Sequence, residues 1–238
     1  MTERMQQVTV RKAEDRGVAN FGWLHSRHSF SFGEYYDPNH VGFRSLRVIN
    51  QDQVAAGGGF PTHPHRDMEI FSYVLEGALA HEDSMGNGRT LQPGQIQLMS
   101  AGKGVTHSEF NPSKTDSVHF LQIWLQPDQI GLAPSYTEWH PSESDASRQK
   151  VLVISPDGRE NSAVIHQNAF IYRVRLAAGD TLAHDLVDGR GLWLQVISGE
   201  LTLDNEPLGP GDGAAVEYAG SHTIVADTSS EALLFDLA

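Results

Sequence analysis

Two short motifs in the first half of the chain contain residue types that bind metals. The first is His63-Pro64-His65, and the second pairs His107 with Glu109. On an extended chain, side chains two positions apart point to the same face, so each motif directs two potential ligands into one space. Pro64 fixes its own φ and favours an extended conformation at His63. The two motifs together predict a metal site.

Three imidazoles and one carboxylate form a ligand set for one divalent transition metal. Such a set suits iron, manganese, nickel, cobalt, copper or zinc. The sequence contains no cysteine, which excludes thiolate ligands and disulfide bonds. Four protein ligands leave one or two coordination positions open for a substrate oxygen or dioxygen. A catalytic metal needs such an opening.

A second carboxylate competes for the fourth ligand position. Glu69 lies four residues after His65, so His-x-His-x-x-x-Glu is itself a plausible three-ligand sequence. Spacing alone leaves open whether Glu69 or Glu109 completes the site. The carboxylate that does not bind the metal is expected to orient one of the histidine ligands.

Three other motifs do not occur in the sequence, and nothing in it points to a Ser-His-Asp triad, which is recognised by geometry rather than by spacing. Gly57-Gly58-Gly59 is not followed by Lys-Ser or Lys-Thr, nor by a helical pattern, so it does not predict a phosphate-binding loop. Neither a Gly-x-Ser-x-Gly motif nor a Gly-x-Gly-x-x-Gly motif after a strand is present. The remaining histidines are expected to be structural or surface residues, namely His25, His28, His40, His81, His119, His140 and His166.

The elements that position these motifs are predicted to be β-strands. Strand-like segments are Phe43–Asn50, Glu69–Leu75, Gln95–Met99, Val105–Phe110 and Val118–Leu125. Turn sequences that contain Gly or Pro separate them at regular intervals. Short strands with such spacing are typical of a β-sandwich or β-barrel, so we expect an all-β protein.

The second half of the chain repeats the first in outline. Val74–Leu79 is echoed by Val196–Leu201, and Leu91–Gly94 is echoed by Leu208–Gly211. This order predicts two related domains. We place the first at residues 1–132, and we assign residues 133–238 to a linker and a second domain, with 132–150 as the linker.

The second half does not repeat the ligand motifs. His184 is not part of a His-x-His sequence, and Ile224 follows His222 where the pattern would require Glu. We therefore expect a degenerate second domain without its own metal.

Longer sequence segments resemble the pirin family. The segment from His63 through Glu69 to Gly77, and the segment from Pro93 to Glu109, are similar to the two cupin motifs of pirins. Residues 27–32 and 36–38 also resemble the pirin N-terminal segment. The resemblance is dense in the first half and only general in the second, and it implies two cupin (jelly-roll β-barrel) domains in tandem.

The resemblance also implies a ligand set. In pirins the carboxylate ligand is the Glu of the His-x-Glu pair, which implies His63, His65, His107 and Glu109 as ligands here, with Glu69 next to them. It favours Fe2+ as the metal.

Bacterial pirins are associated with quercetin 2,3-dioxygenase activity. The resemblance therefore implies an enzyme that opens a flavonol ring with O2 and releases carbon monoxide, with Glu109 as the catalytic base. A flat polyphenol requires an apolar cavity. We expect candidate wall residues among the aromatic side chains Phe30, Phe32, Phe43, Phe71 and Tyr73.

Two other functions are compatible with the same ligands. One is a regulatory protein whose metal, through its redox state, controls binding to a transcription-related protein partner. The other is a different cupin enzyme, such as an isomerase, which would need other polar groups in its cavity. Substrate turnover distinguishes these alternatives from the dioxygenase.

The composition argues against other partners. The net charge is −13, from 17 basic and 30 acidic residues, and such a charge repels nucleic acid and anionic lipid. No apolar segment approaches the length of about 18 residues that a membrane helix needs. We therefore expect a soluble cytoplasmic protein that does not bind nucleic acid directly.

Overall fold

The computed structural model describes residues 7–238, and within that range it consists almost entirely of β-strands. Its helical segments are three short 3-10 turns, η1 (Ala13–Asp15), η2 (Glu143–Ser147) and η3 (Arg159–Asn161). No helix in this range is long and apolar enough to cross a membrane. The prediction of an all-β protein is confirmed.

The chain divides into two compact units, and neither is one continuous segment. What we call the N-terminal unit consists of Arg16–Ser142 and Ile154–Asn168, and the C-terminal unit consists of residues 7–15, Glu143–Val153 and Ala169–Ala238. Within the C-terminal unit, strand β1 (Thr9–Arg11) pairs with β20 (Gly213–Val216). The sequence-based boundary at residue 132, by contrast, treats each domain as uninterrupted.

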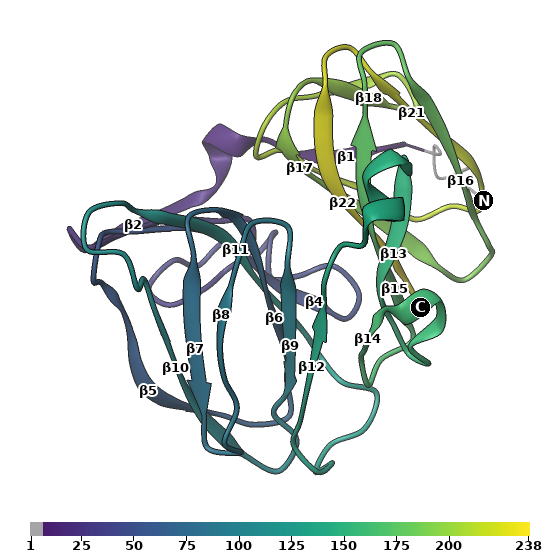
Figure 1. Ribbon diagram of the computed structural model, residues 1–238. Helices are drawn as coiled ribbons and strands as arrows, with labels where there is room; N and C mark the ends of the chain where they lie inside the picture. The colour runs from purple at the N-terminus through teal and green to yellow at the C-terminus, as the bar shows by residue number, and fades with distance from the viewer. Residues whose placement is uncertain (1–6) are drawn as a thin grey trace. The chain divides into compact units, whose positions relative to one another are not determined.

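The N-terminal unit contains a larger and a smaller β-sheet (Figure 1). The larger sheet has the order β12 (Ser135–Trp139), β9 (Ile96–Ser100), β6 (Glu69–Glu76), β11 (Val118–Leu125), β4 (Leu46–Val54), β3 (Leu24–His28) and β2 (Gly17–Asn20). The smaller sheet has the order β5 (Gly59–His65), β10 (Val105–Phe110), β7 (Leu79–Asp83) and β8 (Gly88–Leu91).

The C-terminal unit has a corresponding pair of sheets. The first has the order β1, β20, β17 (Gly191–Ser198), β22 (Ser230–Leu237), β15 (Ala169–Leu176) and β13 (Lys150–Ser155). Strand β14 (Ala163–Val164) belongs to the residues of the N-terminal unit. The second has the order β16 (Thr181–Leu186), β21 (Gly220–Ala226), β18 (Leu201–Leu203) and β19 (Glu206–Leu208). The prediction of two cupin domains in tandem is confirmed.

Two glycines show how closely the two units correspond. Gly77 follows β6 with φ +75°, and Gly199 follows β17 with φ +76°. A Cβ atom at either position would lie less than 3.0 Å from a backbone carbonyl oxygen, that of Ser117 before β11 or that of Ser229 before β22. Only glycine tolerates both the positive φ and this close approach. The repeated sequence therefore encodes the same turn twice.

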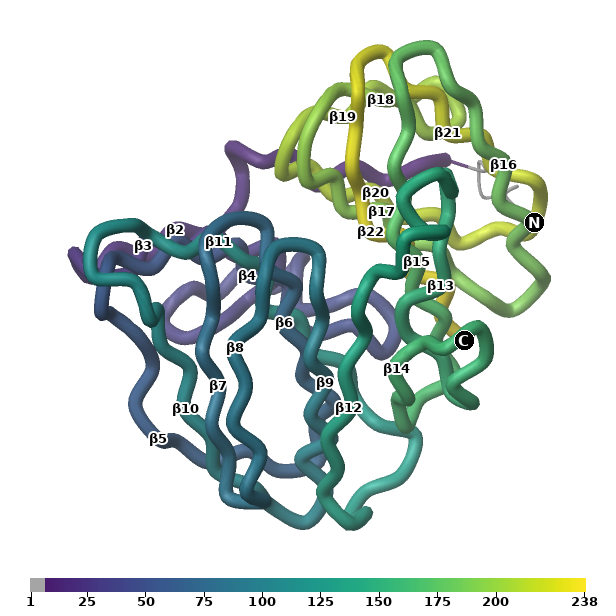
Figure 2. Tube along the Cα trace, viewed as in Figure 1, coloured from purple at the N-terminus to yellow at the C-terminus, as the bar shows by residue number. Residues whose placement is uncertain are grey.

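Two local predictions differ from the structure. Strand β12 lies within residues 132–150, which the sequence predicted to be a linker, and it pairs with β9 along its whole length (Figure 2). Strand β4 begins at Leu46 rather than Phe43. These two residues close a tight turn through reciprocal backbone hydrogen bonds, with Arg44 at φ +53°.

The interior of the N-terminal unit combines an apolar cluster with buried polar residues. Val54 on β4 packs in a buried cluster with Leu24 and Val118 on the neighbouring strands. Asn50 and Asp52, on the same face of β4, are also buried, each with 3% of its surface exposed. Polar residues are mostly exposed, and buried ones generally have hydrogen-bond partners, so we expect both side chains to take part in hydrogen bonds.

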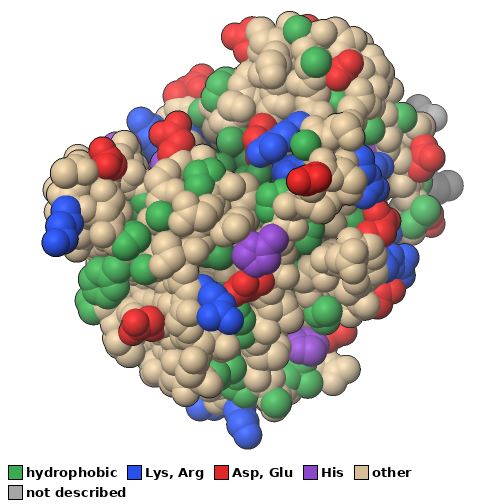
Figure 3. Space-filling model, in the orientation of Figure 1, with side chains coloured by type: hydrophobic (Ala, Val, Ile, Leu, Met, Phe, Trp, Pro, Cys, Tyr) green, Lys and Arg blue, Asp and Glu red, His purple; other side chains and the backbone are tan. Residues whose placement is uncertain are grey.

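Charged side chains of both signs are interspersed on the surface. On the face shown in Figure 3, the Lys and Arg side chains of the described residues lie scattered among Asp and Glu side chains and form no continuous basic patch. The acidic excess of the sequence is thus spread over this face.

Candidate metal centre

Strands β5 and β10 bring the two predicted motifs together. They pair antiparallel, with His107 directly opposite His63. A register shift then places Glu109 opposite Phe60, so β5 contains one extra residue at this point. Bulges of this kind bend a strand and redirect its side chains. The Nε2 atom of His107 lies 3.0 Å from Nε2 of His65 and 3.1 Å from Nε2 of His63.

Hydrogen bonding orients one imidazole for metal binding, and burial keeps the other two neutral. Nδ1 of His63 lies 2.8 Å from the carbonyl oxygen of Pro61, which can only accept, so Nδ1 donates and Nε2 is the nitrogen that faces the other two rings. Burial, and then the charge of His63, lowers the pKa of His65 to about 4. Burial, and then the charges of His65 and His63, lowers the pKa of His107 still further. His65 and His107 are therefore neutral at pH 7.

The spacing of the three nitrogens fits one metal ion. Two nitrogens that each lie about 2.1 Å from an ion, at right angles to each other, are about 3.0 Å apart. The Nε2 distances from His107 to His65 and to His63 match this value. The three side chains form one group whose ligand atoms lie within 4.8 Å of one another.

Glu109 lies beside this group, and its carboxylate is held by neutral side chains. It falls into a second group of possible ligands, with His81 and His107. Ser72 Oγ donates to Oε1 at 2.7 Å, and Gln122 Nε2 donates to Oε2. The side chain is buried, and burial raises its pKa. Glu109 is therefore a stronger base than an exposed carboxylate.

His81 is a site residue that the sequence did not predict. It is fully buried on β7, directly opposite Glu109 on β10. Its Nε2 lies 3.3 Å from Asp83 Oδ2, and because a carboxylate only accepts, Nε2 carries the proton. Its Nδ1 then accepts from Gln97 Nε2 at 2.9 Å, and it also lies 3.4 Å from Nδ1 of His107. This contact favours the His107 tautomer that leaves Nε2 free for a metal.

A row of polar side chains crosses the larger sheet under Glu109. Cross-strand neighbours in this row are His28, Asn50, Gln122, Ser72 and Gln97, one each from β3, β4, β11, β6 and β9. All five are buried. The signal in the sequence is a polar residue at an inward position of an otherwise apolar strand, such as Ser72 in β6. Such a residue can be recognised only after the pairing of the strands is known.

Glu69 lies in a different environment. Its Oε2 accepts a hydrogen bond from Ser100 Oγ at 2.7 Å and one from the backbone N–H of His166 at 3.1 Å. Neither group of possible metal ligands in the described chain includes Glu69. The spacing of two residues in His-x-His does not extend to Glu69, because β5 ends at His65 and Glu69 begins β6.

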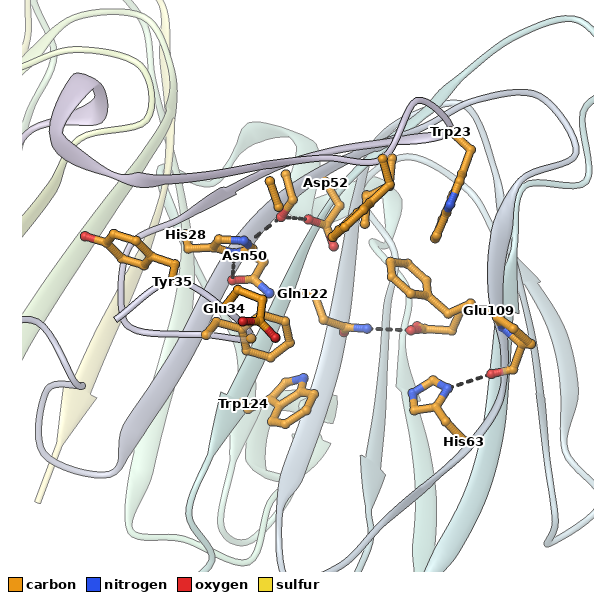
Figure 4. Close-up of a pocket in the computed structure, with 18 of the residues that line it drawn as sticks. Trp23, His28, Glu34, Tyr35, Asn50, Asp52, His63, Glu109, Gln122 and Trp124 are labelled. Atoms are coloured by element: carbon orange, nitrogen blue, oxygen red, sulfur yellow. Dashed lines mark hydrogen bonds between the residues drawn. The ribbon is translucent and has the colours of Figure 1, made fainter. Parts of the chain in front are cut away.

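The His and Glu cluster opens into a cavity of about 740 Å³ in the N-terminal unit (Figure 4). His63, His65, Glu109 and Gln122 line one part of it. Most of the remaining wall is aromatic or aliphatic, and its aromatic members are Phe21, Trp23, Phe32, Tyr35, Phe60 and Trp124. Trp124 contacts His65 edge to face, with ring centroids 4.8 Å apart. A flat apolar ligand fits such a wall.

Of the aromatic residues expected at this wall, only Phe32 lines the cavity. The expectation was wrong for Phe30, Phe43, Phe71 and Tyr73. Phe71 and Tyr73 flank Ser72 on β6, and because Ser72 points to Glu109, its two neighbours point to the opposite face of the sheet.

The C-terminal unit keeps a trace of the same arrangement. His184 and His222 lie opposite each other on β16 and β21, as His63 and His107 do on β5 and β10. Here, however, His184 Nε2 lies 3.0 Å from Asp236 Oδ2, and His222 Nδ1 lies 2.6 Å from Asp204 Oδ2. Each ring is held by its own carboxylate, so the two histidines do not converge.

Fold and site together define a tandem cupin protein in which, among residues 7–238, two groups of potential metal ligands share His107. Residues 9–125 match the family model described as pirin, and residues 152–237 match that of the quercetinase C-terminal cupin domain. The chain belongs to the pirin family.

Individual relatives are similar over their whole length. The chain is 47% identical to a protein of Escherichia coli K12 named quercetin 2,3-dioxygenase, over 97% of this chain and 98% of that one. The crystal structure of YhhW from E. coli superposes with a TM-score of 0.94 at 46% identity, covering 98% of each chain. A crystal structure of the bacterial pirin YhhW in complex with nickel(II) gives 0.93 at 45% identity, covering 97% of this chain and 99% of that one.

Proposed function

We propose that this protein is a metal-dependent dioxygenase that opens the central ring of a flavonol such as quercetin. The observation that carries the proposal is the convergence of three imidazoles, two of which, His63 and His65, line an aromatic-walled cavity. The names of the relatives supply the substrate class.

His63, His65 and His107 would hold the metal through Nε2, and Glu109 would complete the set of ligands. Bound metal supplies a Lewis acid that lowers the pKa of a hydroxyl group next to it. The aromatic wall, including Trp124 beside His65, would hold the flat flavonol and exclude water. The chain itself thus orients the substrate and controls its proton.

Glu109 is the proposed base for the 3-hydroxyl proton. Burial raises its pKa, so the carboxyl group keeps a proton more readily once it has received one. Ser72 and Gln122 hold the two carboxylate oxygens in place through their hydrogen bonds. His81 orients His107 from behind and thereby keeps its Nε2 directed at the ion.

The overall reaction is balanced without another reductant or oxidant. Two carbon–carbon bonds of the central ring break, and both atoms of O2 enter the ester product. The carbon atom that carried the 3-hydroxyl group leaves as carbon monoxide. Four electrons pass from the flavonol to O2.

The expected metal is Fe2+, on the basis of the family resemblance. Nickel is the alternative to test first, because a structure of a pirin relative is a complex with nickel(II). Imidazole and carboxylate ligands accept both ions.

Release of carbon monoxide from quercetin in air tests the proposal. The protein would be stripped of metal and reloaded with iron, nickel, manganese, cobalt or copper, with His107→Ala as the control. Metal-dependent release by the wild type, absent in the variant, supports the dioxygenase. Stoichiometric metal binding without release for any of the ions would contradict it and favour a regulatory protein or a different cupin enzyme.

A further inference from the structure

A second set of buried polar residues lines the same cavity, on strands β3 and β4. Ser26 lies directly opposite Asp52, and His28 lies opposite Asn50. All four side chains are buried, with 2–4% of their surface exposed, and all four line the cavity. Figure 4 shows Gln122 between Asn50 and Glu109, so these residues lie on the side away from the histidine cluster. The proposed reaction gives them no role.

Hydrogen bonds join the four residues into one chain. His28 Nδ1 lies 2.7 Å from Asn50 Oδ1, and Nδ1 donates because the amide oxygen accepts. The same Nδ1 is 3.4 Å from Ser26 Oγ, and Ser26 Oγ donates to Asp52 Oδ1. When Asp52 is ionised, these hydrogen bonds run in one direction and end on its carboxylate.

Two polar atoms in this series of hydrogen-bonded residues lack a partner among the described residues. Within residues 7–238, Asp52 Oδ2 and Asn50 Nδ2 have no hydrogen-bond partner from the protein. Burial is also the main reason that the pKa of Asp52 is raised to about 7. Neither atom is among the fully buried side-chain atoms that lack a partner, so both keep contact with the cavity, where a polar group of a ligand can reach them.

The surroundings restrict what that ligand group can be. Asp52 is flanked by Phe120 on β11, and the next residue on the same face of β4 is Val54. Trp23 and Phe60, in contact at 5.3 Å between ring centroids, form the adjacent part of the wall. A hydroxyl group on the edge of an aromatic ring satisfies both the apolar wall and the carboxyl group.

The geometry of the larger sheet determines the distance between Asp52 and the polar residues around Glu109. Gln122 lies opposite Asn50, and Asp52 is two residues farther along β4. Diagonal neighbours of this kind are about 7–8 Å apart. Gln122 contacts Glu109, so a ligand with two or three linked rings can reach from Glu109 to Asp52.

We infer that Asp52, supported by Ser26 and His28, binds a ring hydroxyl of the substrate at a position remote from the 3-hydroxyl. This inference rests on the proposed flavonol substrate. It assigns Asp52 to the selection of polyhydroxylated flavonols, whereas Glu109 acts on the reacting hydroxyl.

Two probes separate these roles. Quercetin carries hydroxyl groups on its outer rings, and 3-hydroxyflavone carries only the 3-hydroxyl group. Dissociation constants for both would be measured by calorimetry under nitrogen with metal-loaded protein, so that binding is read without turnover. Variants are Asp52→Ala and Asp52→Asn, with the exposed Asp188→Asn of the C-terminal unit as the control.

Asp52→Ala should weaken quercetin binding about tenfold or more and change 3-hydroxyflavone binding less than about threefold. Asp52→Asn keeps the size of the side chain, which guards against a folding defect, and should lose several-fold in quercetin binding alone. Equal losses for both probes, or none for either in a folded variant, would overturn the inference. If the Asp52 variants lose quercetin binding selectively but the wild type releases no carbon monoxide, the proposed reaction is overturned and the binding role of Asp52 stands.

Discussion

The Nε2 atoms of His65 and His107 lie 3.0 Å apart, although 42 positions separate the two residues in the chain. The antiparallel pairing of β5 with β10 brings them together, since it sets His107 opposite His63 and next to His65. Two neutral imidazoles that direct their nitrogen lone pairs at the same point repel each other weakly. The arrangement becomes favourable only when a cation lies between the two nitrogens. The fold therefore maintains this arrangement without help from the three side chains themselves.

His107 should be the most sensitive of the histidines to replacement. It belongs to both groups of potential ligands, and its Nε2 lies 3.0 Å from that of His65 and 3.1 Å from that of His63. His107→Ala should abolish stoichiometric metal binding, as measured by elemental analysis after dialysis, and leave the fold intact by circular dichroism. His25→Ala, an exposed histidine on β3, is the matched control and should keep a full complement of metal. Full metal occupancy in His107→Ala would refute the assignment.

Replacement of Glu109 should affect catalysis, whereas replacement of Glu69 should affect stability. Glu109→Gln keeps an oxygen for the metal but loses the base, so we expect kcat to fall by about 10²–10⁴-fold with partial retention of metal. Glu69→Ala removes the acceptor for Ser100 and the His166 backbone. It should lower the free energy of unfolding by about 1–3 kcal/mol without changing metal content. Loss of metal in the Glu69 variant but not in the Glu109 variant would reverse the roles.

His81 should affect the metal through His107. Without His81, Nδ1 of His107 loses the contact that favours its metal-binding tautomer. His81→Ala should weaken metal affinity about 10–100-fold, the range seen when residues behind a metal ligand are removed. Competition with a chelator measures this affinity. Replacement of His119, a half-buried histidine of β11 outside both groups, should have no such effect; equal weakening in the two variants would show that His81 has no specific role.

Much of the fold could be predicted from short-range patterns. Val105–Phe110 and Val118–Leu125 were predicted with the bounds that β10 and β11 have. Turn glycines such as Gly77 and Gly199 revealed the duplication, because their conformation is local. The shared direction of His63 and His65 could also be predicted, since i and i+2 positions share a face on any strand.

What the sequence did not reveal depends on register. His81 faces Glu109, and Asp52 faces Ser26, only because particular strands pair in a particular alignment. A shift by one residue would turn each of them to the other face of its sheet. The sequence also gave no means to separate Ser72, which faces the site, from Phe71 and Tyr73, which do not. Such residues become recognisable when a polar side chain is found at an inward position.

The buried carboxyl group of Asp52 should make stability depend on pH in a defined direction. Burial, and secondarily the charge of Glu109, raises its pKa to about 7, against 3.8 as its ordinary value, while Ser26 opposes the shift. Between these two values the folded state holds a proton that the unfolded state has released. The contribution of Asp52 is therefore most favourable below the lower value and is lost as pH rises to about 7, by at most about 1.4 kcal/mol per pH unit.

Asp52→Asn removes this titration and keeps the shape of the side chain. The free energy of unfolding in urea would be measured for both proteins at intervals from pH 5 to pH 8. The wild type should lose stability relative to Asp52→Asn as pH rises to 7, and the difference should become constant above it. Asp188→Asn should show no such trend. A difference between wild type and Asp52→Asn that stays flat across this range would mean that Asp52 is already ionised in the folded protein, because only a proton held by the folded state alone produces the slope.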